Sequence, residues 1–139
     1  MLLLDNSAWA RIVMNALDDE RAAAVGDLIE RDELATCLPF LLEAGYSARS
    51  ATHLKEIMDD LDLFPRVRIT NKVEKRAAQA QRELAAVGHH RLAPIDVMIA
   101  SCAHEAGAGV LHYDSDYDIL ATHTNLRFHS EWLAPAGTL

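Results

Sequence analysis

Four acidic residues each stand at or just after a short apolar run, although they are spread over most of the chain. They are Asp5, Glu43, Asp96 and Asp114. Asp5 ends a Leu-Leu-Leu run and Asp114 ends a Val-Leu-His-Tyr run. Because runs of this kind are typical of buried strands and core helices, we expect all four carboxylates to be held near the core of a sheet.

Such a placement is costly for isolated carboxylates. A buried carboxylate needs a partner, and carboxylates that converge repel one another unless they are protonated or bridged by a cation. One acid alone could be a helix cap or half of an ion pair, but four together favour a metal site. Mg²⁺ or Mn²⁺ is the expected occupant, because hard cations of this size take oxygen ligands.

Predicted strands and helices alternate along the chain. Apolar patterning predicts strands over residues 2–5, 34–37, 67–69 and 110–113, and a short edge strand over 126–129. Helical spacing predicts helices over the following segments: 7–17, 20–31, 39–49, 51–63, 71–87, 94–107 and 117–121. Ser7 is expected to cap the first helix, and Asn71 with Glu74 has the form of a capping box. This alternation predicts an α/β fold, with a central parallel sheet of four to five short strands flanked by helices.

Length and composition favour one domain over residues 1–139, since the chain is long enough to bury most of its surface. Asp5 interrupts the N-terminal apolar run, and no apolar stretch approaches the roughly 20 residues of a membrane span. We therefore expect a soluble, cytoplasmic protein without membrane contact. Cys37 and Cys102 lie in no metal-binding or redox motif, so both are expected to be reduced and structural.

The formal net charge of −8 is unusual for a protein that binds nucleic acid, because phosphate binding depends on Lys and Arg. The charge is unevenly distributed. Between residues 66 and 82 the chain carries one acid, Glu74, and six bases: Arg66, Arg68, Lys72, Lys75, Arg76 and Arg82. This segment is either a solvated helix face or a modest surface for RNA phosphates.

Four segments together resemble a known family. They are LLDNSAW at 3–9, LEAGY at 42–46, LAPIDVMIA at 92–100 and VLHYDSDYD at 110–118. In this order and spacing they resemble the acidic segments of PIN-domain ribonucleases, and most closely those of the toxins of VapBC-type toxin-antitoxin systems. The resemblance spans the whole chain and implies a PIN-like three-layer fold.

The resemblance also implies a site and an activity. Asp5, Glu43, Asp96 and Asp114 would be the catalytic acids that hold a divalent metal, with Asp116 as a fifth acid. The implied activity is that of an Mg²⁺- or Mn²⁺-dependent endoribonuclease, in which a metal-activated water cleaves RNA. We expect Asp5, Asp96 and Asp114 to fix the first ion, and Glu43 and Asp116 to position water or a second ion.

The same resemblance implies partners. These are an RNA substrate and a VapB-type antitoxin that plugs the acidic site, within a toxin homodimer and a heterotetramer or larger complex. Apolar residues of the first two helices could leave a groove for a partner helix: Trp9, Ile12, Val25 and Leu28.

The chain departs from the family pattern at a few positions. Tyr117 stands in place of a usual Phe, and Asn6 stands in place of a usual Thr, although Ser7 keeps a hydroxyl that could orient Asp5. Asp118 is expected to cap a turn rather than to bind metal. No catalytic role is assigned to His112.

Other readings of the acidic cluster remain open. Receiver domains and haloacid-dehalogenase-like phosphatases also place an acidic Mg²⁺ site on an α/β sheet. The phosphatases need a second Asp where Ser7 stands, and receivers need a late Lys, whereas no Lys follows Lys75. A further alternative is a catalytically silent PIN-like module that binds RNA or a protein partner. The target RNA cannot be predicted, because shape-based recognition of RNA leaves no simple code in a protein sequence.

Overall fold

Five short strands form one parallel sheet in the computed structural model, which describes residues 1–139. The strands are β1 (Leu2–Leu4), β2 (Leu34–Cys37), β3 (Arg66–Val67), β4 (Gly109–His112) and β5 (Ser130–Trp132). Their order across the sheet is β3-β2-β1-β4-β5, and every neighbouring pair is parallel. The predicted α/β fold with a parallel sheet is confirmed.

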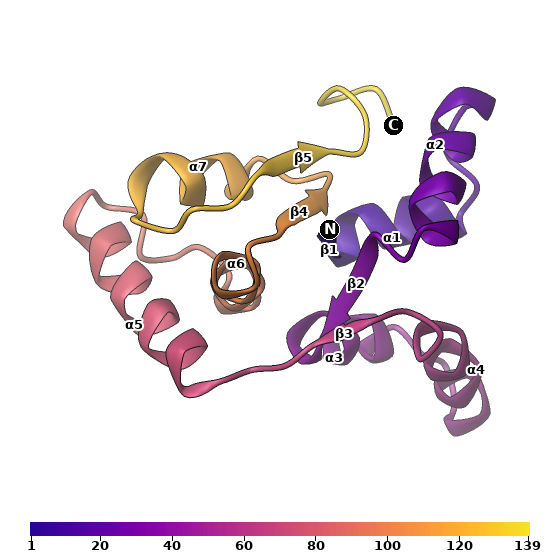
Figure 1. The fold of residues 1–139 in the computed structure, drawn as a ribbon, viewed down its shortest axis with the longest axis horizontal. Helices are drawn as coiled ribbons and strands as arrows, with labels where there is room; N and C mark the ends of the chain where they lie inside the picture. Colours follow the sequence, from indigo (N-terminus) through magenta and orange to yellow (C-terminus); the bar gives the residue numbers. More distant parts are fainter.

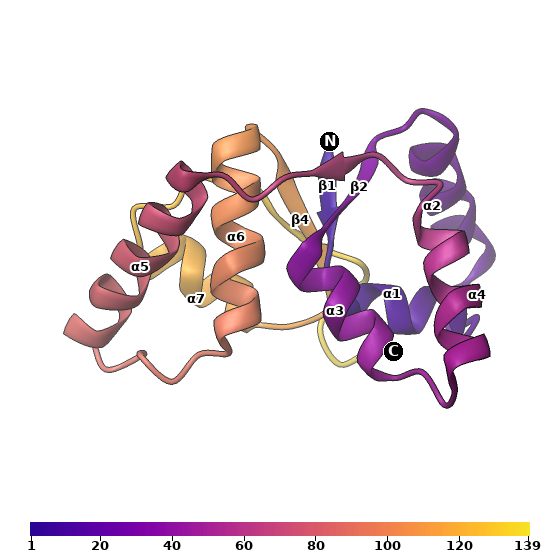
Figure 2. The same ribbon diagram turned by 90° about the horizontal axis from the view of Figure 1, so that it is seen from below.

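Seven helices surround the sheet. They are α1 (Asn6–Val13), α2 (Asp19–Glu30), α3 (Leu38–Tyr46), α4 (Ala51–Leu61), α5 (Asn71–Ala86), α6 (Pro94–Ala106) and α7 (Asp116–His123). Figures 1 and 2 show α5, α6 and α7 together on one side of the strands, with α1, α2 and α4 on the other. Helices on both sides are what a parallel sheet requires, because each crossover connection carries a helix.

The central strands are buried on both faces. Every residue of β2 and β4 is buried, and Leu3 and Leu4 of β1 have no exposed surface. This explains why these strands read as continuous apolar runs rather than as alternating patterns. Cys37 and Cys102 are both buried and unpaired in this core, as the sequence predicts.

The predicted edge strand at 126–129 is wrong. Leu126 is buried and Phe128 packs against the core, but the strand begins four residues later, at Ser130, which pairs with Val110. The apolar pattern therefore marked a loop that covers the core. The true strand is polar, and Asp118 anchors it by accepting a hydrogen bond from the Trp132 indole at 2.9 Å.

Two predicted helix caps are also wrong. Asp5, not Ser7, caps α1, and Thr70, not Asn71, caps α5 by accepting a hydrogen bond from the Val73 amide. In both cases the cap lies earlier than predicted, because an extended residue with a side-chain oxygen was already available. The first helix also ends at Val13 and does not reach residue 17.

The remaining boundaries lie close to the predictions. α3 ends at Tyr46 rather than near residue 49, α4 at Leu61 rather than 63, and β3 covers Arg66–Val67 rather than 67–69. Gly107 ends α6 in the left-handed conformation, with φ of 65°, which glycine adopts without steric cost. None of the helices combines the length and the apolar character that crossing a membrane would need.

Candidate metal centre

The predicted acids lie at one edge of the sheet. Asp5 directly follows β1, Asp114 lies just after β4, and Asp116 begins α7. Asp96 is in the first turn of α6, and Glu43 lies inside α3, which starts where β2 ends. Because the strands are parallel, their carboxyl ends meet at this edge, which is where open α/β sheets bind ligands.

Three of the acids form the tightest group. Asp96, Asp114 and Asp116 each offer a carboxylate oxygen, and these oxygens lie within 4.8 Å of one another. Asp96 is buried, whereas the other two are half-buried. The Asp116 amide donates to Oδ1 of Asp114 at 3.0 Å, so the turn that links them holds both side chains on one side.

Asp5 is fixed by partners on both of its oxygens. Oδ2 accepts hydrogen bonds from the Ser7 amide at 2.8 Å and from the Ser7 hydroxyl. That hydroxyl in turn accepts a hydrogen bond from the Tyr113 amide at 2.8 Å. Ser7 therefore orients Asp5, as the sequence suggests, and also ties the start of α1 to the loop after β4.

Tyr117 connects Asp5 to the tight group. Its hydroxyl lies 2.8 Å from Oδ1 of Asp5 and 3.3 Å from Oδ1 of Asp96, and its side chain is fully buried. Burial, the negative charges of both acids and these hydrogen bonds raise the pKa of Tyr117 well above its usual value. The tyrosine therefore keeps its proton and acts as a donor between two acids.

The electrostatics of the site favour a cation. Burial raises the pKa of Asp96 to about 7, and the neighbouring charges of Asp5, Asp114, Glu43 and Asp116 add to this effect. Burial followed by the charges of Asp5 and Asp114 also raises the pKa of Glu43. Burial and Asp114 raise the pKa of Asp116. These raised values record a concentration of negative charge that a bound cation would relieve.

His112 supports the turn that carries Asp114. Its Nδ1 accepts a hydrogen bond from the Asp114 amide at 3.1 Å, so the proton of this buried ring is assigned to Nε2. Nε2 lies 2.7 Å from the Ser130 hydroxyl, which donates to Oδ1 of Asp118 at 2.8 Å. Burial lowers the pKa of His112, which favours this neutral form.

The sequence did not predict this supporting network. Asp118 was expected to cap a turn, but it lies inside α7 and holds β5 through Ser130 and Trp132. The sequence marks Tyr117 only as a residue that differs from the usual Phe of the family pattern. One sequence signal for this role exists. Tyr117 carries a hydroxyl where the family pattern has Phe, and a hydroxyl that is buried needs a hydrogen-bond partner.

The donor set fits a hard divalent cation. The grouped ligands are all carboxylate oxygens, with neither sulfur nor ring nitrogen among them, and Mg²⁺ prefers such oxygens at about 2.1 Å. Mg²⁺ and Mn²⁺ therefore fit the residues present.

An apolar groove opens beside the acids. It has a volume of about 490 Å³, and helices α1, α3 and α4 supply most of its lining, including Trp9, Val13, Met14 and Ile57. Asn6 and Ala44, the chain neighbours of Asp5 and Glu43, also line it. Of the four apolar residues predicted to leave a groove on the first two helices, Trp9 lines this groove, whereas Ile12, Val25 and Leu28 only pack on the core. The groove therefore uses α1 but not α2.

Comparisons with known proteins agree with this geometry. Residues 2–122 match the family model described as PIN domain. Ribonuclease VapC18 of Mycobacterium tuberculosis is 37% identical, covering 98% of this chain and 97% of its own length. Ribonuclease VapC51 of the same organism is 36% identical, covering 99% and 96%.

Two solved structures share the fold. A chain of the DNA-bound VapBC complex from Salmonella typhimurium superposes with a TM-score of 0.74 at 18% identity, covering 96% of this chain and 100% of that chain. A chain of FitAcB from Neisseria gonorrhoeae gives a TM-score of 0.67 at 18% identity, covering 97% and 98%.

Proposed function

The chain belongs to the PIN domain family, and we propose that it is the endoribonuclease toxin of a VapBC-type toxin-antitoxin pair. The main observation behind this proposal is that Asp96, Asp114 and Asp116 lie together at the carboxyl edge of the sheet. Relatives that cover nearly all of the chain are named ribonucleases, which supports RNA cleavage by this site. This membership also sets aside the phosphatase and receiver readings.

The proposed activity depends on a divalent ion, Mg²⁺ or Mn²⁺. Asp96, Asp114 and Asp116 would hold it, and Asp5 lies next to them through the shared contact with Tyr117. When bound, such an ion lowers the pKa of a coordinated water and neutralises charge on the scissile phosphate.

The protein contributes orientation and proton handling. Ser7 and Tyr117 donate hydrogen bonds to the two oxygens of Asp5, which holds this carboxylate in one orientation toward the site. Glu43 is half-buried in α3, where burial and the charges of Asp5 and Asp114 raise its pKa, and its carboxyl group would help to position the attacking water. His112 holds the amide of Asp114 and keeps the last acidic turn in place.

The groove beside the acids suits an antitoxin helix. Val13 and Met14 in its lining are 59% and 74% exposed, large values for apolar side chains. An amphipathic helix that covered them would bring its next residues to Asp5 and Glu43, where an Arg or Lys would pair with the acids. The solved structures with this fold include DNA-bound VapBC complexes, which supports a toxin that works in a larger assembly. We place a toxin homodimer at the core of that assembly.

A cleavage assay on total cellular RNA tests the proposal. The purified protein, separated from its antitoxin, should cut RNA in the presence of Mn²⁺, and Asp96→Asn should abolish cutting with an unchanged circular dichroism spectrum. Expression of the wild-type protein alone should also arrest growth. A folded wild-type protein that binds Mn²⁺, cuts no RNA and leaves growth unchanged would instead support the catalytically silent module.

A further inference from the structure

We propose that the RNA backbone also binds in a basic groove on the outer face of α5, at the end of the molecule away from the acids. This inference rests on the proposed ribonuclease function and deepens it, because it states where the substrate extends. The first hollow of the groove is lined by Lys72, Lys75, Arg76, Ala78, Gln79, Arg82 and Glu105.

The pattern of α5 explains why these cations are available. Val73, Ala80 and Leu84 are buried and pack the helix onto the core. Lys72, Lys75, Arg76, Gln79 and Arg82 recur at helical spacing on another face, and all five are exposed. The hydrophobic burial of one face therefore presents the basic residues to solvent as a row.

A second hollow lies beside the first. Arg76 lines both, and the second adds His104, Thr124, Asn125 and Arg127. The hollows have volumes of about 600 and 540 Å³. Their shared wall is held in place, because Arg76 pairs with Glu105 at 3.1 Å.

The loop that lines the second hollow is also held in place by side chains. Glu83 accepts a hydrogen bond from the Asn125 amide at 3.1 Å, and His104 accepts one from the Arg127 amide at 2.8 Å. The loop after α7 is therefore tied to α5 and α6. The two hollows lie next to each other on these elements, with Arg76 in the lining of both, and we treat them together as the basic groove.

The charge of the groove suits a polyanion. Arg76 has a carboxylate partner in Glu105, but Lys72, Lys75, Arg82 and Arg127 make no salt bridge. The protein as a whole is acidic, with a net charge of −8. A row of unpaired cations between neutral polar side chains is the usual footprint of phosphate contacts that carry no base specificity.

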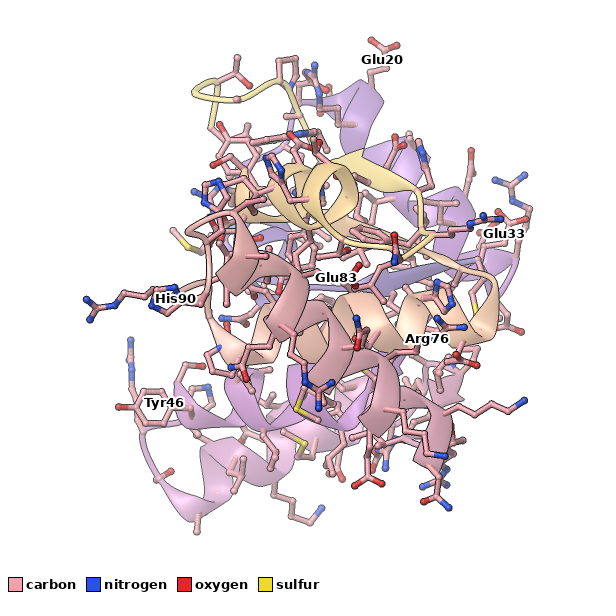
Figure 3. The ribbon with its side chains drawn as sticks, turned by 90° about the vertical axis from the view of Figure 1, so that its left-hand side faces the viewer. Glu20, Glu33, Tyr46, Arg76, Glu83 and His90 are labelled. Carbon is pink, nitrogen blue, oxygen red and sulfur yellow. The ribbon has the colours of Figure 1, made fainter.

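The groove lies far from the metal centre. Glu105 is nine residues beyond Asp96 on α6, which places the two about 13 Å apart along the helix axis. In Figure 3, Arg76 and His90 lie at opposite sides of the view, and His90 belongs to the loop before Asp96. Because a phosphate recurs about every 3.4 Å along a helical strand, an RNA that reaches both sites spans on the order of four or more nucleotides.

Binding measurements test the groove directly. In an Asp96→Asn background, which prevents cleavage, Lys72, Lys75 and Arg82 are changed together to Ala. The probe is a fluorescein-labelled, mixed-sequence RNA of about 24 nucleotides. Three lost phosphate contacts should lower the slope of log K against log salt by about 2, since each contact on a single strand contributes about 0.7. We expect at least a tenfold loss of affinity at low salt.

Two controls separate the groove from general charge effects. The first control changes three cations that lie on or next to α2 and α4 and are already paired with acids: Arg21, Arg31 and Lys55. Replacing these three with Ala should leave RNA binding unchanged. Replacing Lys72 and Lys75 with Arg should also preserve it. In the cleaving protein, the groove triple variant should cut at the same positions but need a higher concentration.

The outcomes distinguish the two proposals. If the wild-type protein cleaves RNA and the groove variant binds it with the same affinity and salt slope, the groove proposal is overturned and the ribonuclease remains. The same conclusion follows if the groove variant loses only an acidic protein partner. If the wild-type protein cleaves no RNA, the proposed function itself fails.

Discussion

The hydroxyl of Tyr117 lies 2.8 Å from Oδ1 of Asp5, although the two residues are 112 positions apart in the chain. The same hydroxyl is 3.3 Å from Oδ1 of Asp96, so one buried donor lies between two acids. A phenol in this position fixes the separation of the carboxylates without adding charge. The site is therefore shaped by a residue that is itself not a ligand.

Tyr117→Phe should weaken metal binding more than it disturbs the fold. Removing a hydrogen-bond partner of a metal ligand lowers metal affinity by about 10-fold to 100-fold in comparable sites. We expect the affinity for Mn²⁺, measured by calorimetry, to fall by about 10-fold. Ser101→Ala is the matched control, because this buried hydroxyl on α6 bonds only to the Val97 carbonyl. Equal Mn²⁺ affinities for the two variants would show that Tyr117 is merely structural.

The pKa of Asp96 predicts a pH-dependent stability. Because burial and neighbouring acids raise this pKa to about 7, the folded state holds a proton that the unfolded state has released above about pH 4. The metal-free protein should therefore lose stability as pH rises from about 5 to 8, by on the order of 2 kcal/mol from this group. Urea unfolding in EDTA measures the free energy of unfolding at both ends of the range.

Two variants test whether Asp96 causes this dependence of the free energy of unfolding on pH. Asp96→Asn should reduce it strongly and should stabilise the metal-free protein at pH 8, whereas Asp27→Asn, on the exposed surface of α2, should retain it. Saturating Mn²⁺ should reverse the trend in the wild-type protein, because the ion binds the deprotonated acids. A slope that persists unchanged in Asp96→Asn would mean that another group titrates.

Metal exchange tests the chemistry of the site. Cleavage should require Mg²⁺ or Mn²⁺, stop on addition of EDTA and return when either ion is restored. Ca²⁺ should inhibit, because its larger and looser coordination sphere positions the reactants poorly. RNA cleavage that continues in excess EDTA would contradict a mechanism based on the carboxylate group.

The apolar groove predicts how an antitoxin is held. Val13→Asp should weaken binding of the cognate antitoxin by at least 10-fold, because it places a charge in the groove lining. Val87→Asp is a matched control, since Val87 is 50% exposed but lies outside the groove. Titration of purified toxin with antitoxin, followed by RNA cleavage, compares the two. Equal inhibition of both variants would place the antitoxin elsewhere.

Much of the fold could be predicted because local patterns were strong. The apolar run at Leu34–Cys37 gave a strand with the predicted bounds, and Pro94 with Gly107 marked the limits of α6. The edge strand was misplaced because its polar residues form a strand only through pairing with β4 and anchoring by Asp118. Such tertiary contacts leave little trace in local composition.

The placement of acids at one edge of the sheet could be predicted from the sequence, whereas the residues that support them could not. Asp5 and Asp114 each follow an apolar strand, so the parallel sheet brings them to one edge. The tight grouping of Asp116 with Asp96 depends on the turn after β4, and the roles of His112 and Tyr117 depend on hydrogen bonds to residues that are distant or poorly patterned. Sequence spacing alone does not determine these contacts.

The link from Asp118 through Ser130 to His112 means that the edge strand β5 is part of what holds the last acidic turn. A ribosome makes Asp5 early and Ser130 late. During synthesis, all the acids are therefore present before the strand that steadies Asp114 has been made. The contact that holds the turn of Asp114 is therefore the last part of this acidic cluster to be synthesised.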